Sequence, residues 1–153
     1  MTLIEKLHSL SLVLPAPPAP AASYVAVSRH ERLLYVSGQG PMQGFTPIIT
    51  GRVGADVTEE RAAQAARLAA LNALAALHNY CGLDRIESIV KLTAFVCSTA
   101  DFHRQHIVVN GASDLLISLF GSAGLHSRSA VGVYTLPFNI PVEIELIAAM
   151  TPD

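Results

Sequence analysis

Residues 128–150, RSAVGVYTLPFNIPVEIELIAAM, decide the fold. The last nine of them alternate with the period of two that is typical of a strand with one buried side. The residues on its apolar side are Val142, Ile144, Leu146, Ala148 and Met150. Residues 128–134 predict a second strand before it.

Upstream of this stretch, strands are predicted at 24–28, at 33–37 and at 86–97, with a short third strand around 48–53. A helix capped by Asp56 or Thr58 runs through an alanine-rich body to Tyr80 and stops at Gly82. A second helical region opens at Asp101 and ends at Gly121. The order β-β-(β)-α-β-α-β-β favours an α+β two-layer sandwich, with one sheet and two helices on one face.

Length and composition restrict the function classes. A chain of 153 residues predicts one domain. Charged residues make up only 14% of the chain, which indicates that a second copy covers the free face of the sheet. The net charge of −2 disfavours a nucleic-acid partner.

The N-terminus differs in composition from the rest. Leu3, Ile4, Leu7 and Leu10 recur at helical spacing, and a Pro/Ala-rich connector follows up to Ala22. We therefore divide the chain into an N-terminal helix and connector, residues 1–22, and a single domain, residues 23–153. No apolar run is expected to reach the ~18–20 residues that span a bilayer, so no membrane partner is predicted.

The two cysteines, Cys81 and Cys97, have neither the spacing of a metal site nor that of a disulfide framework. Two reduced thiols are most compatible with the cytoplasm. His103 and His106 have a spacing that could share a metal, but no third ligand has a matching spacing, so we predict a solvated helix face and no metal site.

Three charged side chains interrupt the two last strands. Arg128 begins a strand that is otherwise apolar, and a guanidinium at such an edge needs a carboxylate of the chain or a bound anion. Glu143 and Glu145 interrupt the strand 142–150 in the same way. The pattern therefore predicts either one structural Arg–Glu pair, with the other glutamate solvated, or a ligand site.

Several segments together carry a family resemblance. They are RSAVGVYTLP at 128–137, VEIELIA at 142–148, VSGQGP at 36–41 and VKLTAFV at 90–96, with Tyr24. In this register, residues 23–150 resemble the Rid family of reactive intermediate deaminases, also called YjgF-like proteins. Residues 110–116 and the loop 42–50 resemble a branch often described as chorismate-mutase-like or endoribonuclease-like.

The resemblance implies a chorismate-mutase-like (bacillus type) α+β fold, with one mixed β-sheet, and a homotrimer with ligand clefts between subunits. Arg128 matches the family's carboxylate-binding arginine, and Glu143 matches its water-positioning glutamate. The residues that match substrate-binding positions are Tyr24, Ser37, Asn110 and Ala130. Ala130 stands where the family often has cysteine, so that only its backbone can contribute.

The activity that the resemblance implies is hydrolysis of enamines and imines of amino acids, such as 2-aminoacrylate, to 2-keto acids and ammonia, with no metal or organic cofactor. A planar guanidinium can hold the substrate carboxylate, and a glutamate can orient water onto the C=N carbon. The alternative is a non-catalytic binder of 2-keto acids or similar small carboxylates, which needs Arg128 but not Glu143. Endoribonuclease activity, claimed for some relatives, is disfavoured by the net charge.

Overall fold

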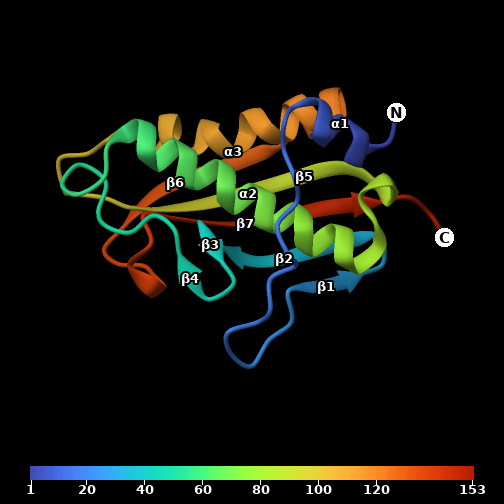
Figure 1. The fold of residues 1–153 in the computed structure, drawn as a ribbon, viewed down its shortest axis with the longest axis horizontal. Helices are drawn as coiled ribbons and strands as arrows, with labels where there is room; N and C mark the ends of the chain where they lie inside the picture. Colours follow the sequence, from blue (N-terminus) through green and yellow to red (C-terminus); the bar gives the residue numbers. More distant parts are fainter.

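A five-stranded sheet forms one layer of the computed structural model, which describes residues 1–153 (Figure 1). Its strands lie in the order β1-β2-β7-β5-β6, and only β5 and β6 pair in parallel. Their bounds are β1 Val27–His30, β2 Leu33–Gln39, β5 Ile86–Cys97, β6 Ser127–Val133 and β7 Val142–Met150. Helices α2 (Glu59–Cys81) and α3 (Gln105–Phe120) cover one face, which confirms the predicted two-layer α+β fold.

Helix α2 begins and ends where the sequence signals predict. The side chain of Thr58 accepts a hydrogen bond from the backbone N–H of Arg61 at 3.1 Å, so Thr58 rather than Asp56 is the cap. Gly82 ends the helix in a left-handed conformation, with φ 82°. The alanine-rich body lets α3 approach closely, because a Cβ on Gly111 would overlap the backbone carbonyl of Ala63.

Helix α3 and the turn after it correct the expectation about apolar runs. Residues Gln105–Gly124 are long and apolar enough to cross a membrane by length and composition. In the structure this stretch is a core helix, packed on α2 and on the sheet. Its fully buried side chains are those of Val108, Val109, Ala112, Leu115, Leu116 and Leu119.

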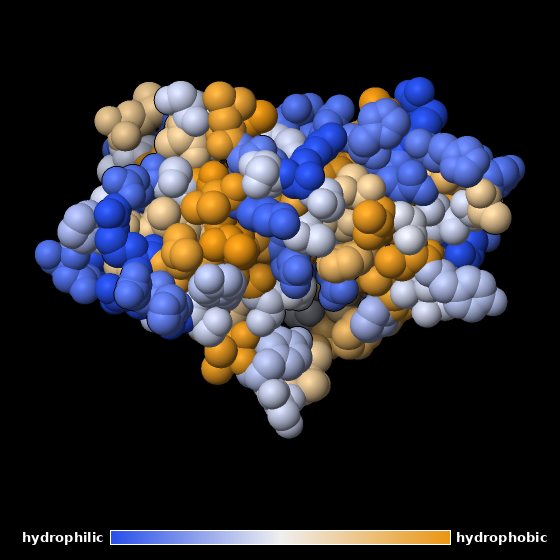
Figure 2. Space-filling model, turned by 180° about the vertical axis from the view of Figure 1, so that it is seen from behind, coloured by the Kyte–Doolittle hydropathy of each residue, from blue (hydrophilic) through white to orange (hydrophobic).

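Strand β7 lies at the centre of the sheet, between β2 and β5. Its five predicted apolar residues are all buried against the helices, whereas Glu143 is half-buried and Glu145 exposed on the other face. Figure 2 shows the molecule from behind, where apolar patches lie on either side of the middle and hydrophilic residues gather at the left edge and the upper right. Val131, 44% exposed, pairs with Phe95 on this helix-free face.

Two predicted starts and one predicted strand are wrong, and the strand predicted at 33–37 extends to Gln39. The first strand is Val27–His30 instead of 24–28, because the turn is only Glu31–Arg32 and residues 29–30 join the ladder. Residues 48–53 form no strand, since Gly51 turns the chain at φ 114°; the short strands here are β3 (Met42–Gln43) and β4 (Thr46–Pro47). Helix α3 begins at Gln105 instead of Asp101, after a separate turn closed by Phe102 N–H on Thr99 O at 3.1 Å.

The N-terminal helix α1 (Leu3–Ser9) packs onto the domain. Thr2 and Glu5 form a capping box at its start, and Leu7 is 1% exposed in the core. The Pro/Ala-rich segment then runs without helix or strand from α1 to the loop before β1 (Figure 1). Both ends of the segment are therefore attached to the fold.

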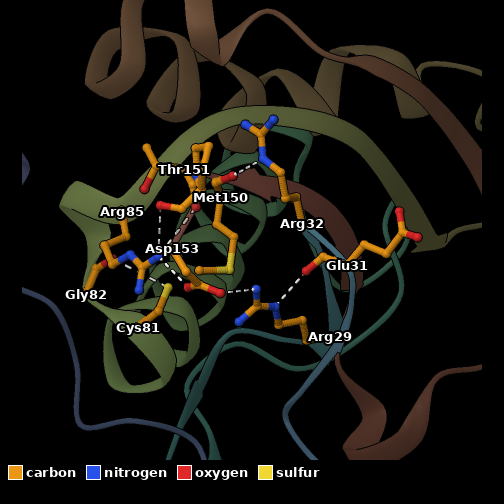
Figure 3. Close-up of polar contacts among 10 residues, drawn as sticks. Arg29, Glu31, Arg32, Cys81, Gly82, Arg85, Met150, Thr151 and Asp153 are labelled. Carbon is orange, nitrogen blue, oxygen red and sulfur yellow. Dashed lines mark hydrogen bonds and ion pairs between the residues drawn. The ribbon is translucent and has the colours of Figure 1, made fainter.

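The C-terminal residues tie β1 to the turn after α2, as Figure 3 shows. The Asp153 carboxylate accepts from Arg29 and from Arg85, at 2.9 Å each. These hydrogen bonds, first that of Arg85, lower the pKa of the Asp153 carboxyl. Beside them, Arg32 donates to the backbone carbonyl of Met150 at 2.9 Å.

Candidate functional site

Arg128 lies on the edge strand β6 and points toward the helix layer. It is in register with Leu92 of β5, whose side chain is completely buried under the helices. Its Nη1 donates to Ser113 Oγ at 3.0 Å, and its Nη2 donates to the backbone carbonyl of His106 at 2.8 Å. No carboxylate of the chain pairs with Arg128, so the predicted structural Arg–Glu pair does not form within one chain.

His126 positions the Ser113 hydroxyl that Arg128 contacts. His126 Nδ1 lies 2.7 Å from the carbonyl of Gly124, a group that can only accept, so Nδ1 carries the proton. Nε2 is then the acceptor for the hydroxyl of Ser113, 2.9 Å away. Ser113 Oγ keeps its lone pairs for Arg128, and the guanidinium retains N–H donors for an anion.

Two other predicted residues lie near this guanidinium. Asn110 is half-buried on α3, on the same helix face as His106 and Ser113. Ala130 follows Arg128 by two residues on β6 and therefore faces the same side of the sheet. Arg128, Asn110 and Ala130 together form what we term the arginine half-site.

Glu143 lies on the opposite face of the sheet. It pairs with Phe95 on β5 and lies over Gly38 of β2, where an added Cβ would stand 2.7 Å from Glu143 Oε1. Its carboxylate has no ion-pair or hydrogen-bond partner in the chain. Burial, and then the charge of Glu145, raise the pKa of Glu143 above its usual range, which makes it a better base.

A cavity of about 380 Å³ opens beside Glu143. Tyr24 lines it, and its hydroxyl accepts from the N–H of Ala21 at 3.3 Å. Ser37 does not line the cavity; its hydroxyl donates to the carbonyl of Val25 at 2.7 Å and so holds the chain before β1. We term Glu143, Gly38, Tyr24 and the cavity the glutamate half-site.

One small ligand cannot contact both half-sites of a single chain. In the register of the sheet, Glu143 of β7 is level with Val131 of β6, and the two strands are two strand spacings apart. Val131 lies three residues along β6 from Arg128. From standard sheet dimensions the two Cα atoms are about 14 Å apart. The side chains also point to opposite faces, so a site that uses both must combine residues of two copies.

Sequence reasoning missed the groups that build these half-sites. No pattern in the sequence points to Ser113, and the only signal for His126 is its position just before Arg128. Asn72 is a buried amide in an Ala/Leu-rich helix, and it donates to the carbonyls of Gly40 and Met42 at 2.9 and 3.0 Å. A polar residue in so apolar a helix indicates that its side chain bonds a neighbouring segment, here the loop that contains Gly40 and Met42.

Comparisons with known proteins agree on one family. Residues 15–150 match the family model described as Endoribonuclease L-PSP. Protein TCP17 of Trypanosoma cruzi is 41% identical over 146 residues, which cover 94% of this chain and 91% of that protein.

Solved structures give the same result. The protein Atu1372 of Agrobacterium tumefaciens, of unknown function, superimposes with a TM-score of 0.89 at 40% identity, over 97% of this chain and 92% of that one. E. coli TdcF with bound serine superimposes with a TM-score of 0.61 at 27% identity, over 91% and 96%.

Proposed function

The chain belongs to the endoribonuclease L-PSP (YjgF/Rid) family, and from this membership we propose that it hydrolyses reactive imines and enamines of amino acids. The products are 2-keto acids and ammonia. Members of the family generally bind small molecules and form oligomers. The proposed place of action is the cytoplasm, in keeping with two free cysteines, Cys81 and Cys97.

The observation that carries the proposal is the state of Glu143. A half-buried carboxylate without a partner loses part of its hydration, and no hydrogen bond or ion pair within the chain compensates for that loss. Such a group is retained where it acts on a ligand, and its raised pKa suits a general base. Arg128 is the matching cation, held in place by Ser113 and the backbone carbonyl of His106 but free of any carboxylate.

We propose that the working unit is a homotrimer with clefts between subunits. The separation of Arg128 and Glu143 on opposite faces supports a cleft that takes one residue from each of two copies. The partly exposed apolar residues of the helix-free face support burial of that face in the assembly (Figure 2). Each trimer would then hold three equivalent sites.

The reaction needs only water and proton transfers. Arg128 grips the substrate carboxylate with two parallel N–H donors, which fixes the neighbouring C=N carbon. Glu143 accepts a proton from water as the water oxygen attacks that carbon, and the C=N electron pair moves to nitrogen. Glu143 then returns its proton to nitrogen, which gives a carbinolamine. The same carboxylate next takes the carbinolamine hydroxyl proton and delivers it to nitrogen, so that the C–N bond breaks and ammonia leaves as the carbonyl forms.

A second function is a non-catalytic binder of keto acids or similar small carboxylates. The family relative TdcF has been crystallised with serine, an amino acid that keeps its carboxylate and amine, which favours recognition without turnover. Such a binder uses Arg128 and does not need the basicity of Glu143. Endoribonuclease activity, which the family description suggests, is opposed by the net charge of −2.

Glu143→Gln separates enzyme from binder, because it keeps the shape and removes the basicity. We expect a loss of ~10²-fold or more in turnover of 2-iminopropionate, with pyruvate affinity kept within a few-fold. Arg128→Ala should abolish both. Glu145→Gln, two residues along on the same face, is the matched control at neutral pH. Unchanged turnover in Glu143→Gln would reject the catalytic role of Glu143, and keto-acid binding without any turnover in the wild type would favour the binder.

A further inference from the structure

The cavity in the glutamate half-site has mainly apolar side walls, and Tyr24, Gln39 and Asn72 are its neutral polar side chains. Its side walls include Ala19, Met42, Phe45, Phe138 and Ile140, and Glu143 is its only ionised group. Its volume of about 380 Å³ lies within the range in which proteins enclose whole small-molecule ligands. The methyl group of an alanine-derived imine would leave most of this space unfilled.

The charges of the two half-sites determine how a substrate lies. A substrate carboxylate inside the cavity would face the like charge of Glu143 with no cation near it. The carboxylate therefore belongs at Arg128, on the other side of the reacting carbon from the cavity. The remaining substituent of that carbon, the amino-acid side chain, is the part that points into the cavity.

Backbone features restrict the conformation of two of the walls. Pro18 and Pro20 fix the backbone φ of the segment that forms the outer wall, and the hydrogen bond from Ala21 to Tyr24 joins that wall to the cavity rim. Phe138 is kept in a left-handed conformation, φ 60°, that a bulky residue adopts only when its surroundings impose it. A preformed apolar cavity selects by shape, because little ordering remains when the ligand enters.

We propose that this cavity is a side-chain pocket that selects imines of large apolar amino acids, such as leucine and phenylalanine, over the imine of alanine. This inference rests on the proposed function, since it names the substrate class of the same site. The chemistry is the hydrolysis already described, with one water consumed and one ammonia released. The Pro/Ala-rich segment is then part of the specificity pocket.

The test compares imines made in the assay from alanine, leucine and phenylalanine by an amino-acid oxidase. We expect kcat/KM for the leucine imine to exceed that for the alanine imine by at least ~10-fold, the smallest effect typical of one methylene in a fitted pocket. Equal or better use of the alanine imine would overturn the inference and leave the proposed hydrolysis standing.

Phe45→Ala tests the wall itself, since Phe45 is exposed on the loop between β3 and β4 and its loss should not disturb the core. We expect the ratio of kcat/KM for the leucine imine to kcat/KM for the alanine imine to fall ~10-fold. Tyr80→Ala is the matched control, because Tyr80 is an exposed aromatic residue that does not line the cavity. Equal losses for both imines in Phe45→Ala would contradict a side-chain pocket.

Keto-acid binding keeps the two proposals distinguishable. The keto acids of leucine and alanine are titrated into the wild type and into Phe45→Ala by calorimetry. One outcome is that no imine is hydrolysed, but the wild type binds the leucine-derived keto acid at least ~10-fold more tightly than the alanine-derived one and Phe45→Ala does not. The proposed hydrolysis is then rejected and the proposed side-chain pocket is supported. If both keto acids bind equally, or neither binds, the proposed side-chain pocket is rejected. It is also rejected if a neighbouring subunit fills the cavity in the assembly.

Discussion

Gly38→Ala tests whether the position of the Glu143 carboxylate sets the rate. The new Cβ would lie 2.7 Å from Oε1 and 2.9 Å from Cδ of Glu143, whereas ordinary contact begins near 3.4 Å. The carboxylate must therefore retreat by about 0.7 Å. A displacement of 1 Å costs on the order of 10²-fold in rate, so we expect kcat to fall ~10–100-fold.

The substitution should leave the fold intact. Gly38 does not have a positive φ, so alanine introduces no backbone strain there. Thermal unfolding should occur within a few degrees of the wild type, since alanine is favoured over glycine in a strand by about 0.5–1 kcal/mol and this offsets part of the contact.

A double-mutant cycle isolates the mechanism. Imine hydrolysis is measured for Gly38→Ala in the wild-type and in the Glu143→Ala background, with turnover trapped as the keto acid. If Gly38→Ala acts through the carboxylate, it should have no further effect once that carboxylate is absent. Equal losses in both backgrounds, or full activity of the single variant, would refute the reasoning.

The remaining predictions concern charge geometry, pH and packing. Arg128→Lys should recover little of the activity lost in Arg128→Ala, because an ammonium is a point charge and cannot hold a carboxylate at two points; steady-state kinetics that match the wild type would contradict this. Glu145→Gln should move the acid limb of the pH–rate profile to lower pH, because the charge of Glu145 raises the pKa of Glu143; an unmoved limb would leave burial as the whole cause. Gly111→Ala should destabilise the protein by about 1–3 kcal/mol in urea unfolding, because its Cβ meets the carbonyl of Ala63, and unchanged stability would mean that the two helices are not in close contact.

Local patterns determined much of the fold. The strands 86–97 and 142–150 were predicted with their observed bounds, because alternation and β-branched residues are read directly along the chain. Thr58 and Gly82 mark the ends of α2 for the same local reason. Residues 48–53 misled because their β-branched residues resemble a strand, while the conformation of Gly51 depends on the loop around it.

The sequence by itself also singled out Arg128 and Glu143, because a charge in an apolar strand stands out wherever the strand lies. Only the tertiary structure decided that they face opposite sides of the sheet. That outcome depends on the register of β6 against β5 and of β5 against β7, which are pairings between residues far apart in the sequence. The cavity beside Glu143 likewise needs the Pro/Ala-rich segment, β2 and the loop before β7 to meet, and no local pattern specifies such a meeting.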